Sequence, residues 1–200
     1  MKLETLVLGL IETNCYFISE GSSLLIIDPA SSPRRLIEKI NNSYDGRVTA
    51  ILLTHGHFDH IGAVDALVRT YGCPVYGCRD DERLFTDEKV NSMAGMSATV
   101  KSEITWLEDE TITLGGIEVK VYYTPGHSPG SVMFEIGGML FSGDTIFYEG
   151  IGRTDLYGGS FSQLKQSAEI LNRLPYDMII YPGHGPETTV GHELRYNPYL

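Results

Sequence analysis

The sequence is short of cysteine. Its 200 residues include only Cys15, Cys73 and Cys78. An odd number of thiols does not form the paired framework of a small disulfide-stabilised secreted domain. Cys73 and Cys78 are not accompanied by a second cysteine pair, which argues against a thiolate zinc site. We therefore expect three reduced thiols in a cytoplasmic protein.

Basic residues and long apolar runs are also scarce. Lysine and arginine number 15 against 26 acidic residues, which gives a formal net charge of -11. Nucleic-acid-binding proteins usually carry a basic face, so this balance argues against a nucleic-acid partner. No segment approaches the ~18 apolar residues of a membrane span, so no membrane partner is expected. The segment Met1 to Leu10 is interrupted by Glu4 and predicts a first strand rather than a secretion signal.

What the chain does contain is enough apolar sequence for one core. Hydrophobic residues make up 42% of the 200 positions, and no repeat or linker-like composition divides them. This length predicts a single domain over residues 1–200. Short strand-like runs and helical segments occur in both halves, which predicts an α+β fold.

Apolar runs separated by turn residues place the expected elements. Strands are expected at Leu3–Leu8, Cys15–Ser19, Leu24–Ile27, Val48–Leu53, Val75–Tyr76, Thr111–Leu114, Ile117–Tyr123, Val132–Ile136, Met139–Ser142 and Met178–Tyr181. One helix is expected to begin at Pro33 with Ser32 as its N-cap, and another to follow a capping box of Ser160 and Gln163. Further helices are expected over 63–71 and, weakly, 80–85, while 91–99 is expected to be a loop.

Three histidines and an aspartate follow the apolar strand Val48–Leu53 directly, in the segment THGHFDH. Residues two apart in an extended segment point to the same side, so His55 and His57 can face one ion together. Asp59 and His60 lie near a predicted helix start and can turn toward a second ion. A lone loop histidine is usually just a polar residue, but four ligand-type residues within six positions favour a metal site.

Three more candidate ligands stand beside glycines at predicted strand ends, namely His127, Asp144 and His184. Each alone would be an ordinary polar loop residue. Together with the first cluster they provide His55, His57 and His127 for one ion and Asp59, His60 and His184 for another. Asp144 is expected to bridge ions about 3.5–4 Å apart, with a hydroxide between them as nucleophile. Imidazole and carboxylate suit zinc, iron or manganese.

The ordered motifs THGHFDH, TPGHSPGS, FSGDTIF and YPGHGPET resemble those of the metallo-β-lactamase superfamily. Within it, the chain is most similar to the glyoxalase II-like (hydroxyacylglutathione hydrolase-like) group, over nearly its whole length. The resemblance implies a four-layer αββα sandwich with the metal site at one edge of two packed sheets. It also implies the seven ligands above, two divalent ions with zinc first among them, and a catalytic role for Asp59.

Two departures from that group limit what the resemblance implies about substrate. Glyoxalase II enzymes typically carry a C-terminal helical domain that helps to hold glutathione, and we expect none here. Their Gly-x-Gly-Lys-Phe loop is replaced by GIGRTD at 150–155. Arg153 is expected either to bind a substrate carboxylate or to brace the loop by pairing with Asp155 or Glu149. Tyr148 is a candidate pocket wall.

Two further residues are candidates for supporting the ligands. Asp28 and Thr54 can exchange hydrogen bonds with the ligand histidines and so fix their orientation. Both stand at strand ends close in sequence to an expected ligand or turn.

The leading hypothesis is a hydrolase that cleaves a small-molecule thioester or small ester. The alternative is a mononuclear iron persulfide dioxygenase-like oxidoreductase, which needs only His55, His57, His127 and Asp144. A catalytically silent metal-binding domain is less favoured because no ligand is missing. The acidic charge disfavours a nuclease, and the expected cytoplasmic location disfavours a β-lactamase. The metal, the acyl group, the thiol carrier and the oligomeric state stay open at this stage.

Overall fold

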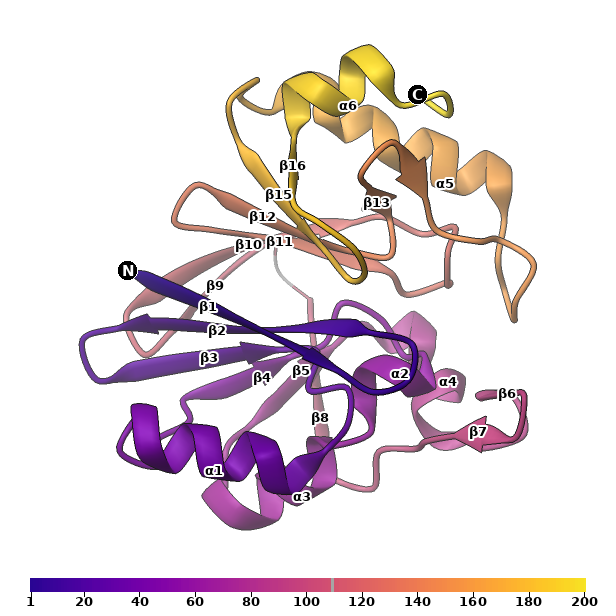
Figure 1. The fold of residues 1–200 in the computed structure, drawn as a ribbon. Helices are drawn as coiled ribbons and strands as arrows, with labels where there is room; N and C mark the ends of the chain where they lie inside the picture. The colour runs from indigo at the N-terminus through magenta and orange to yellow at the C-terminus, as the bar shows by residue number, and fades with distance from the viewer. Residues whose placement is uncertain (109) are drawn as a thin grey trace.

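The computed structural model describes residues 1–108 and 110–200, and it places two six-stranded sheets face to face (Figure 1). The first sheet has the order β1-β2-β3-β4-β5-β8 and the second the order β16-β15-β12-β11-β10-β9. The strands of the first sheet are β1 (Lys2–Leu8), β2 (Thr13–Glu20), β3 (Ser23–Ile27), β4 (Ala50–Leu52), β5 (Val75–Gly77) and β8 (Ile104–Trp106). Those of the second are β9 (Thr111–Leu114), β10 (Ile117–Tyr123), β11 (Val132–Ile136), β12 (Met139–Gly143), β15 (Ile179–Pro182) and β16 (Thr188–Thr189).

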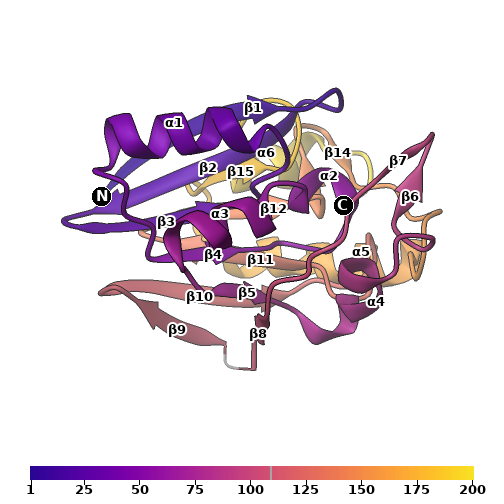
Figure 2. The same ribbon diagram turned by 90° about the horizontal axis from the view of Figure 1, so that it is seen from below.

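Helices cover the outer face of each sheet. Figure 2 shows α1 (Pro33–Ser43) and α3 (Val64–Tyr71) on the first sheet, and Figure 1 shows α5 (Phe161–Ala168) and α6 (Val190–Tyr196) above the second. The 3₁₀ helix η2 (Glu169–Arg173) continues α5. Near one edge of the sheets lie α2 (Phe58–Ile61), the 3₁₀ helix η1 (Arg79–Asp81) and α4 (Glu82–Thr86), with the hairpins β6–β7 (Ser92–Met93, Met96–Ser97) and β13–β14 (Ile146–Phe147, Gly150–Ile151).

Strand periodicity explains the layers. Successive side chains of a strand point to opposite faces, so a strand covered on both sides is apolar throughout. In β2, Phe17 packs into the cluster under α1 and α3, whereas Tyr16 and Ile18 pack between the sheets. A third cluster, which includes Leu140 and Leu171, joins the second sheet to its helices. These three apolar layers are the core of an αββα sandwich, as the family resemblance implied.

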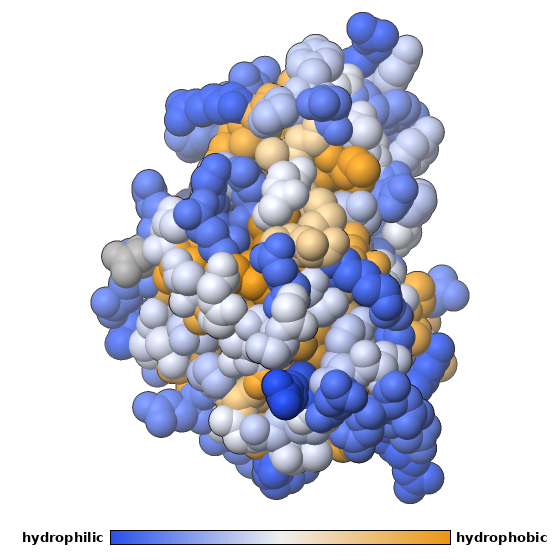
Figure 3. Space-filling model, turned by 90° about the vertical axis from the view of Figure 1, so that its left-hand side faces the viewer, coloured by the Kyte–Doolittle hydropathy of each residue, from blue (hydrophilic) through white to orange (hydrophobic). Residues whose placement is uncertain are grey.

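The surface reflects the same layering. Seen from the left of Figure 1, hydrophobic residues gather mainly across the middle of the molecule, while hydrophilic residues cover much of its ends (Figure 3). None of the helices in the described ranges is long and apolar enough to cross a membrane.

Strand direction brings the candidate residues to one edge. β12 runs parallel to β15, and β10 is antiparallel to β11, which is antiparallel to β12. The carboxyl ends of β10, β12 and β15 therefore emerge at the same edge, and each is followed by a candidate ligand. β4 follows α1 in a β-α-β crossover and delivers the THGHFDH segment to that edge from the other sheet.

Most expected elements are present, with local corrections. Pro33 begins α1, but the side chain of Ser32 makes no capping hydrogen bond, because this residue has left-handed backbone angles. Ser160 does cap α5 by accepting from the backbone N–H of Gln163. The expected loop 91–99 contains the hairpin β6–β7, and the expected strand Val48–Leu53 shortens to Ala50–Leu52.

Candidate metal centre

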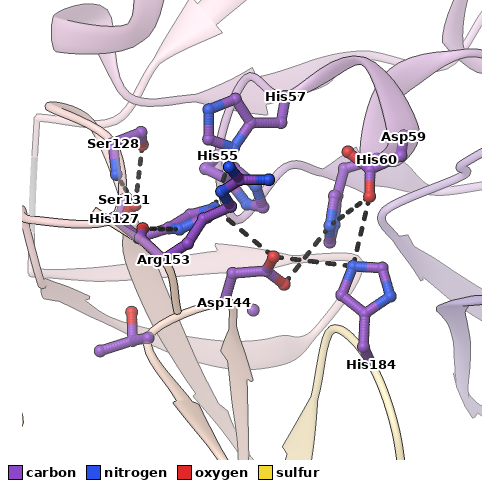
Figure 4. A network of polar contacts seen from close by, with 12 residues as sticks. His55, His57, Asp59, His60, His127, Ser128, Ser131, Asp144, Arg153 and His184 are labelled. Atoms are coloured by element: carbon purple, nitrogen blue, oxygen red, sulfur yellow. Dashed lines mark hydrogen bonds and ion pairs between the residues drawn. The ribbon is translucent and has the colours of Figure 1, made fainter. Parts of the chain in front are cut away.

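The structure brings together all seven residues that the sequence proposed as ligands (Figure 4). His55 and His57 lie in the turn after β4, and Asp59 and His60 lie in α2. His127, Asp144 and His184 follow β10, β12 and β15. Asp144 occupies the middle of the group, with ligand-type atoms on both sides. The four segments come from both sheets, so the site exists only when the two halves of the sandwich are packed.

The first set of ligand atoms belongs to three buried histidines. His55, His57 and His127 each offer a ring nitrogen, and these atoms lie within 4.8 Å of one another. His57 Nδ1 is 2.8 Å from His127 Nε2, and His127 Nε2 is 3.4 Å from Asp144 Oδ2. Two imidazole nitrogens this close repel one another unless a proton or a cation lies between them.

The second set is Asp59, His60 and His184. His184 Nε2 is 3.2 Å from Asp59 Oδ2 and 3.6 Å from Asp144 Oδ2. His60 Nε2 is 3.4 Å from Asp144 Oδ1, the other oxygen of the same carboxylate. Zinc ligands at about 2.0–2.1 Å from the ion in tetrahedral geometry are about 3.3 Å apart. The observed separations therefore suit two neighbouring ions with Asp144 between them.

Unsatisfied polar atoms supply an independent test of fit. Among the buried side-chain atoms that make no hydrogen bond within the described part of the chain, three face the centre of the cluster: His55 Nε2, His60 Nε2 and Asp144 Oδ1. Leaving buried polar groups unpaired costs about 1–3 kcal/mol each. Their place together is explained if they are ligand atoms, and the donor set fits divalent cations of the zinc, iron or manganese type. His57 Nε2 is also unpaired, but it is the Nδ1 atom of that ring that faces His127.

The electrostatics of the cluster also favour added positive charge. Burial, followed by the neighbouring imidazoles, lowers the pKa of His55, and burial and His127 lower that of His57 to about 3. Burial alone would lower the pKa of His60, but the carboxylates of Asp144, Asp59 and Asp28 raise it instead. The neutral histidines are ready to act as ligands, and the carboxylates stabilise any cation placed between them.

Asp28 and Thr54 support the ligands as the sequence indicated. Asp28 Oδ2 lies 2.9 Å from His60 Nδ1 and accepts the Thr54 hydroxyl at 2.6 Å. The Thr54 hydroxyl also lies 3.0 Å from His55 Nδ1. With Nδ1 held in this way, the Nε2 atoms of both histidines turn toward the site. Asp28 also lies close enough to His55 and His60 to complete a third group of potential ligands, but its contacts are those of an orienting carboxylate.

Sequence reasoning missed two residues that hold the first loop in place. Asp81, fully buried, accepts hydrogen bonds from the backbone N–H of Gly56 at 2.8 Å and from Ser128 and Gly130 beside His127. Asn91 donates to the Gly56 carbonyl and accepts from the Phe58 N–H. Burial raises the pKa of Asp81. Neither residue stands in a recognisable motif, because both act across the fold and not along the chain.

Arg153 and Tyr148 are placed differently. The Arg153 guanidinium donates to both oxygens of Asp155, at 2.7 and 2.8 Å, while its backbone carbonyl lies 2.7 Å from His127 Nδ1. The pairing with Asp155 is the bracing arrangement considered above, and the side chain still borders the cavity over the site. The Tyr148 ring stacks on His192 away from that cavity, and the neighbouring Phe147 borders it instead.

An open cavity of about 280 Å³ lies over the cluster. Its floor includes His57, Asp59, His127, Asp144 and His184. Its walls are mainly apolar, and they are formed by Ile11, Phe58, Met93, Phe147 and Leu156, with Arg153 as the cation. A small organic molecule can therefore reach the ligand cluster from solvent.

Gly183 is required by close packing. A Cβ atom at this position would lie 2.1 Å from Asp144 Oδ1 and 2.8 Å from His60 Cε1. Only glycine lets the strand end before His184 approach the shared carboxylate.

Comparison with known proteins gives a consistent picture. Residues 8–184 match the family model of the metallo-beta-lactamase superfamily. The chain is 37% identical to the "Probable metallo-hydrolase YqgX" of Bacillus subtilis, with 100% of this chain and 98% of that protein covered. It is 33% identical to the hydroxyacylglutathione hydrolase GloC of Haemophilus influenzae, over 100% of this chain and 98% of that protein.

Solved structures agree with the fold. The crystal structure of the BLEG-1 B3 metallo-beta-lactamase matches with a TM-score of 0.94 and 38% identity, covering 100% of this chain and 99% of that one. TTHA1623 in a di-iron-bound form matches with a TM-score of 0.90 and 36% identity, over 98% and 100%. ETHE1 from Myxococcus xanthus matches with a TM-score of 0.74 and 27% identity, over 99% and 84%.

Proposed function

The chain belongs to the metallo-beta-lactamase superfamily, and from that premise we propose that it is a binuclear metallohydrolase that cleaves a thioester or small ester. The observation that carries the proposal is the pair of ligand sets that share Asp144. The ligands are His55, His57 and His127 for one ion and Asp59, His60 and His184 for the other. We infer zinc as the metal from the nitrogen-rich donor set, with iron or manganese as alternatives.

Two bound ions would supply a hydroxide nucleophile near neutral pH and would polarise the substrate carbonyl. The protein's own groups position the reactants. Asp59 borders the cavity, and its Oδ2 lies between His60 and His184. We assign this carboxylate the catalytic role of orienting the attacking water and accepting the proton that it loses when the hydroxide forms; the same proton can then pass to the departing thiolate or alkoxide. The apolar walls limit competing water around the carbonyl.

A thioester substrate is supported by one relative and by the cavity. The Haemophilus influenzae relative is a hydroxyacylglutathione hydrolase, at 33% identity over the whole of this chain. The cavity is open, apolar-walled and bordered by one cation, Arg153, among its described lining residues. A small molecule with an apolar reactive part and an anionic remainder fits such walls. The three free, buried cysteines support a cytoplasmic location within the same proposal.

A persulfide dioxygenase-like oxidoreductase with a single iron is the second candidate. One observation favours it, the structural match to ETHE1 from Myxococcus xanthus. The di-iron-bound form of TTHA1623 supports iron as a possible metal, but in a site with two ions. His55, His57, His127 and Asp144 would be sufficient for this chemistry, and the structure brings them together.

Metal analysis combined with two activity assays separates the candidates. Protein purified without chelators is analysed for zinc, iron and manganese, and then assayed with S-lactoylglutathione and simple acyl thioesters. Oxygen uptake is measured separately with glutathione persulfide. We expect two ions per chain and thioester hydrolysis without oxygen uptake. A single iron per chain with persulfide-dependent oxygen uptake would establish the alternative instead.

A further inference from the structure

A second cavity adjoins the one over the ligand cluster. It also measures about 280 Å³, and the two cavities share Ile11, Phe58 and Asp59 as a common wall. The second cavity lies between the β1–β2 turn, α2 and the strand β7, which meet at one end of the molecule (Figure 1). The two cavities are therefore direct neighbours, and both border Asp59.

The walls of this second cavity are almost entirely apolar. Leu8, Leu10, Ile11, Phe58, Met96 and Ala98 supply side chains, and Asp59 is the one charged residue among the described lining residues. The three hydroxyl groups among the lining residues already have partners. Thr13 Oγ1 donates to Asp59 Oδ2, Ser31 Oγ lies near Ser32 Oγ, and Ser97 Oγ donates to Glu88. A polar ligand would lose hydrogen bonds with water here and gain few in return.

The two cavities differ in charge. The described residues around the second cavity include no cation, whereas Arg153 borders the first. Asp155 neutralises part of the Arg153 charge, but the Nη1 atom is turned toward Met93 Sδ at 3.4 Å and not toward a carboxylate. Cellular thiol carriers such as glutathione bear anionic groups, which favour the side of Arg153. The opposite, apolar side then remains for the acyl group.

We propose that the cavity formed by Leu8, Ile11, Phe58, Met96 and Ala98 holds an unbranched apolar acyl chain, so that the preferred substrates are acyl thioesters with several methylene groups. This inference rests on the proposed thioester hydrolase function and deepens it. It also makes the β1–β2 turn and β7 determinants of substrate choice, because they enclose the acyl chain.

The first test measures how activity depends on acyl length. Thioesters of one thiol, N-acetylcysteamine, are prepared with acetyl, butanoyl, hexanoyl and octanoyl groups. Burial of a methylene group contributes about 0.8 kcal/mol, or about fourfold in kcat/KM. We expect kcat/KM to rise more than about a hundredfold from acetyl to hexanoyl and then to level off as the cavity fills. A matching series of acetyl esters of alkyl thiols tests the opposite orientation.

The second test fills the cavity. Ala98→Leu replaces a methyl group of the wall by an isobutyl group, and we expect it to lower the ratio of hexanoyl to acetyl kcat/KM at least about tenfold. Thr99→Leu is the control, because it places the same leucine side chain one residue further on, outside the lining. That control should keep the wild-type ratio. Calorimetric binding of straight-chain carboxylates to both variants gives a readout that does not depend on turnover.

Each outcome decides a different question. A length-dependent rise that Ala98→Leu removes supports the proposal. A flat acyl series with a rise in the alkyl thiol series overturns the acyl placement, and flat results in both overturn the apolar cavity as a binding site. If no thioester is hydrolysed, the proposed function fails. Even then, carboxylate binding that strengthens with chain length in wild type, but not in Ala98→Leu, would support the cavity as a binding site for an apolar chain.

Discussion

At the scale of single residues, one carboxylate joins the two halves of the candidate site. Asp144 faces His60 with one oxygen and His127 and His184 with the other. Burial would raise the pKa of Asp144, but the neighbouring imidazoles hold it well below its usual range, and His60 has the largest effect among them. Its negative charge is therefore available to both proposed ions.

We expect Asp144→Asn to weaken both ions together. Asparagine keeps the size of the side chain but removes the charge that offsets repulsion between two dications. Elemental analysis after dialysis should show less than one ion per chain. His184→Gln is the control, because it removes a ligand of the second set only and should leave about one ion. Retention of two ions by Asp144→Asn would show that this carboxylate does not bridge.

Replacement of Arg153 tests whether it binds a substrate carboxylate or braces its loop. If it binds a substrate carboxylate, Arg153→Ala raises KM by about ten- to a hundredfold, since a charge-assisted hydrogen bond contributes about 1.5–3 kcal/mol. The pairing with Asp155 in the structure favours a bracing role, in which kcat and the melting temperature fall together. Kinetics on acyl thioesters with and without a free carboxylate, beside a melting curve, decide between them. Asp155→Ala is the control, because it removes the brace and frees the guanidinium.

At the scale of elements, α6 holds the β13–β14 hairpin in place, and the chain after this hairpin reaches His127. Glu193 of α6, fully buried, accepts hydrogen bonds from the Glu149 N–H and from Thr188 and Asn197. Asn197 also donates to the Gly150 carbonyl. Three residues beyond that carbonyl, the Arg153 carbonyl lies against His127 Nδ1, so the C-terminal helix positions a candidate ligand from a distance.

Glu193→Gln should therefore lower both stability and metal affinity. The amide turns a donor toward groups that already donate, which costs about 1–3 kcal/mol, or several degrees in melting temperature. Loss of support to a ligand histidine typically lowers metal affinity about ten- to a hundredfold. Competition titration with a chelating dye measures the affinity. Glu169→Gln, exposed on η2, is the matched control; an equal effect there would disprove the specific link.

The contact between β1 and α1 gives a prediction about pH. Lys2 and then Lys39 lower the pKa of Glu4 from 4.5 to about 2. A carboxyl group with a depressed pKa contributes stability that is fully present above pH 4.5 and is lost as the pH falls toward 2. Because the pair is partly solvated, we expect about 1 kcal/mol from it. Glu4→Gln should flatten the decrease in unfolding free energy between pH 4.5 and 2, measured by urea denaturation. An unchanged slope would contradict the assigned pKa.

At the scale of the whole molecule, the site ties the two halves of the sandwich together. His55, His57, Asp59 and His60 come from the half built on the first sheet, and His127, Asp144 and His184 from the other. Ions held between them would bind the folded chain far better than the unfolded one, where the seven ligands are dispersed. Metal binding is therefore expected to contribute a large part of the free energy of unfolding.

Removal of metal by a chelator should lower the melting temperature by several degrees or more, because saturation at a hundredfold over Kd contributes about 2.7 kcal/mol per ion. Calorimetry before and after dialysis against the chelator, with zinc added back, measures the effect. Asp144→Asn should melt at a temperature that responds little to the chelator. If wild type responded as little as this variant, the ions would not link the two halves.

The sequence by itself determined the fold class and the candidate ligands, because both depend on short-range patterns. Strands alternate or run apolar over a few residues, and the HxHxDH spacing places ligands on one loop whatever surrounds it. His127, Asp144 and His184 stand beside glycines at predicted strand ends, where the absence of a side chain lets the backbone come close to the other ligands. The short strand β16 and the helix α6 carry too few residues for a periodic signal, and the sequence did not predict them.

Only the tertiary structure decided which distant groups meet. Asp81 reaches Gly56 and Ser128 across 25 and 47 positions, so no local pattern reveals that it holds both ligand loops. Arg153 had two expected acidic neighbours, and packing put its side chain on Asp155 and turned Glu149 to His192. The apolar cavity is lined by residues from four separate segments, and burial of such a surface is a property of the packed chain.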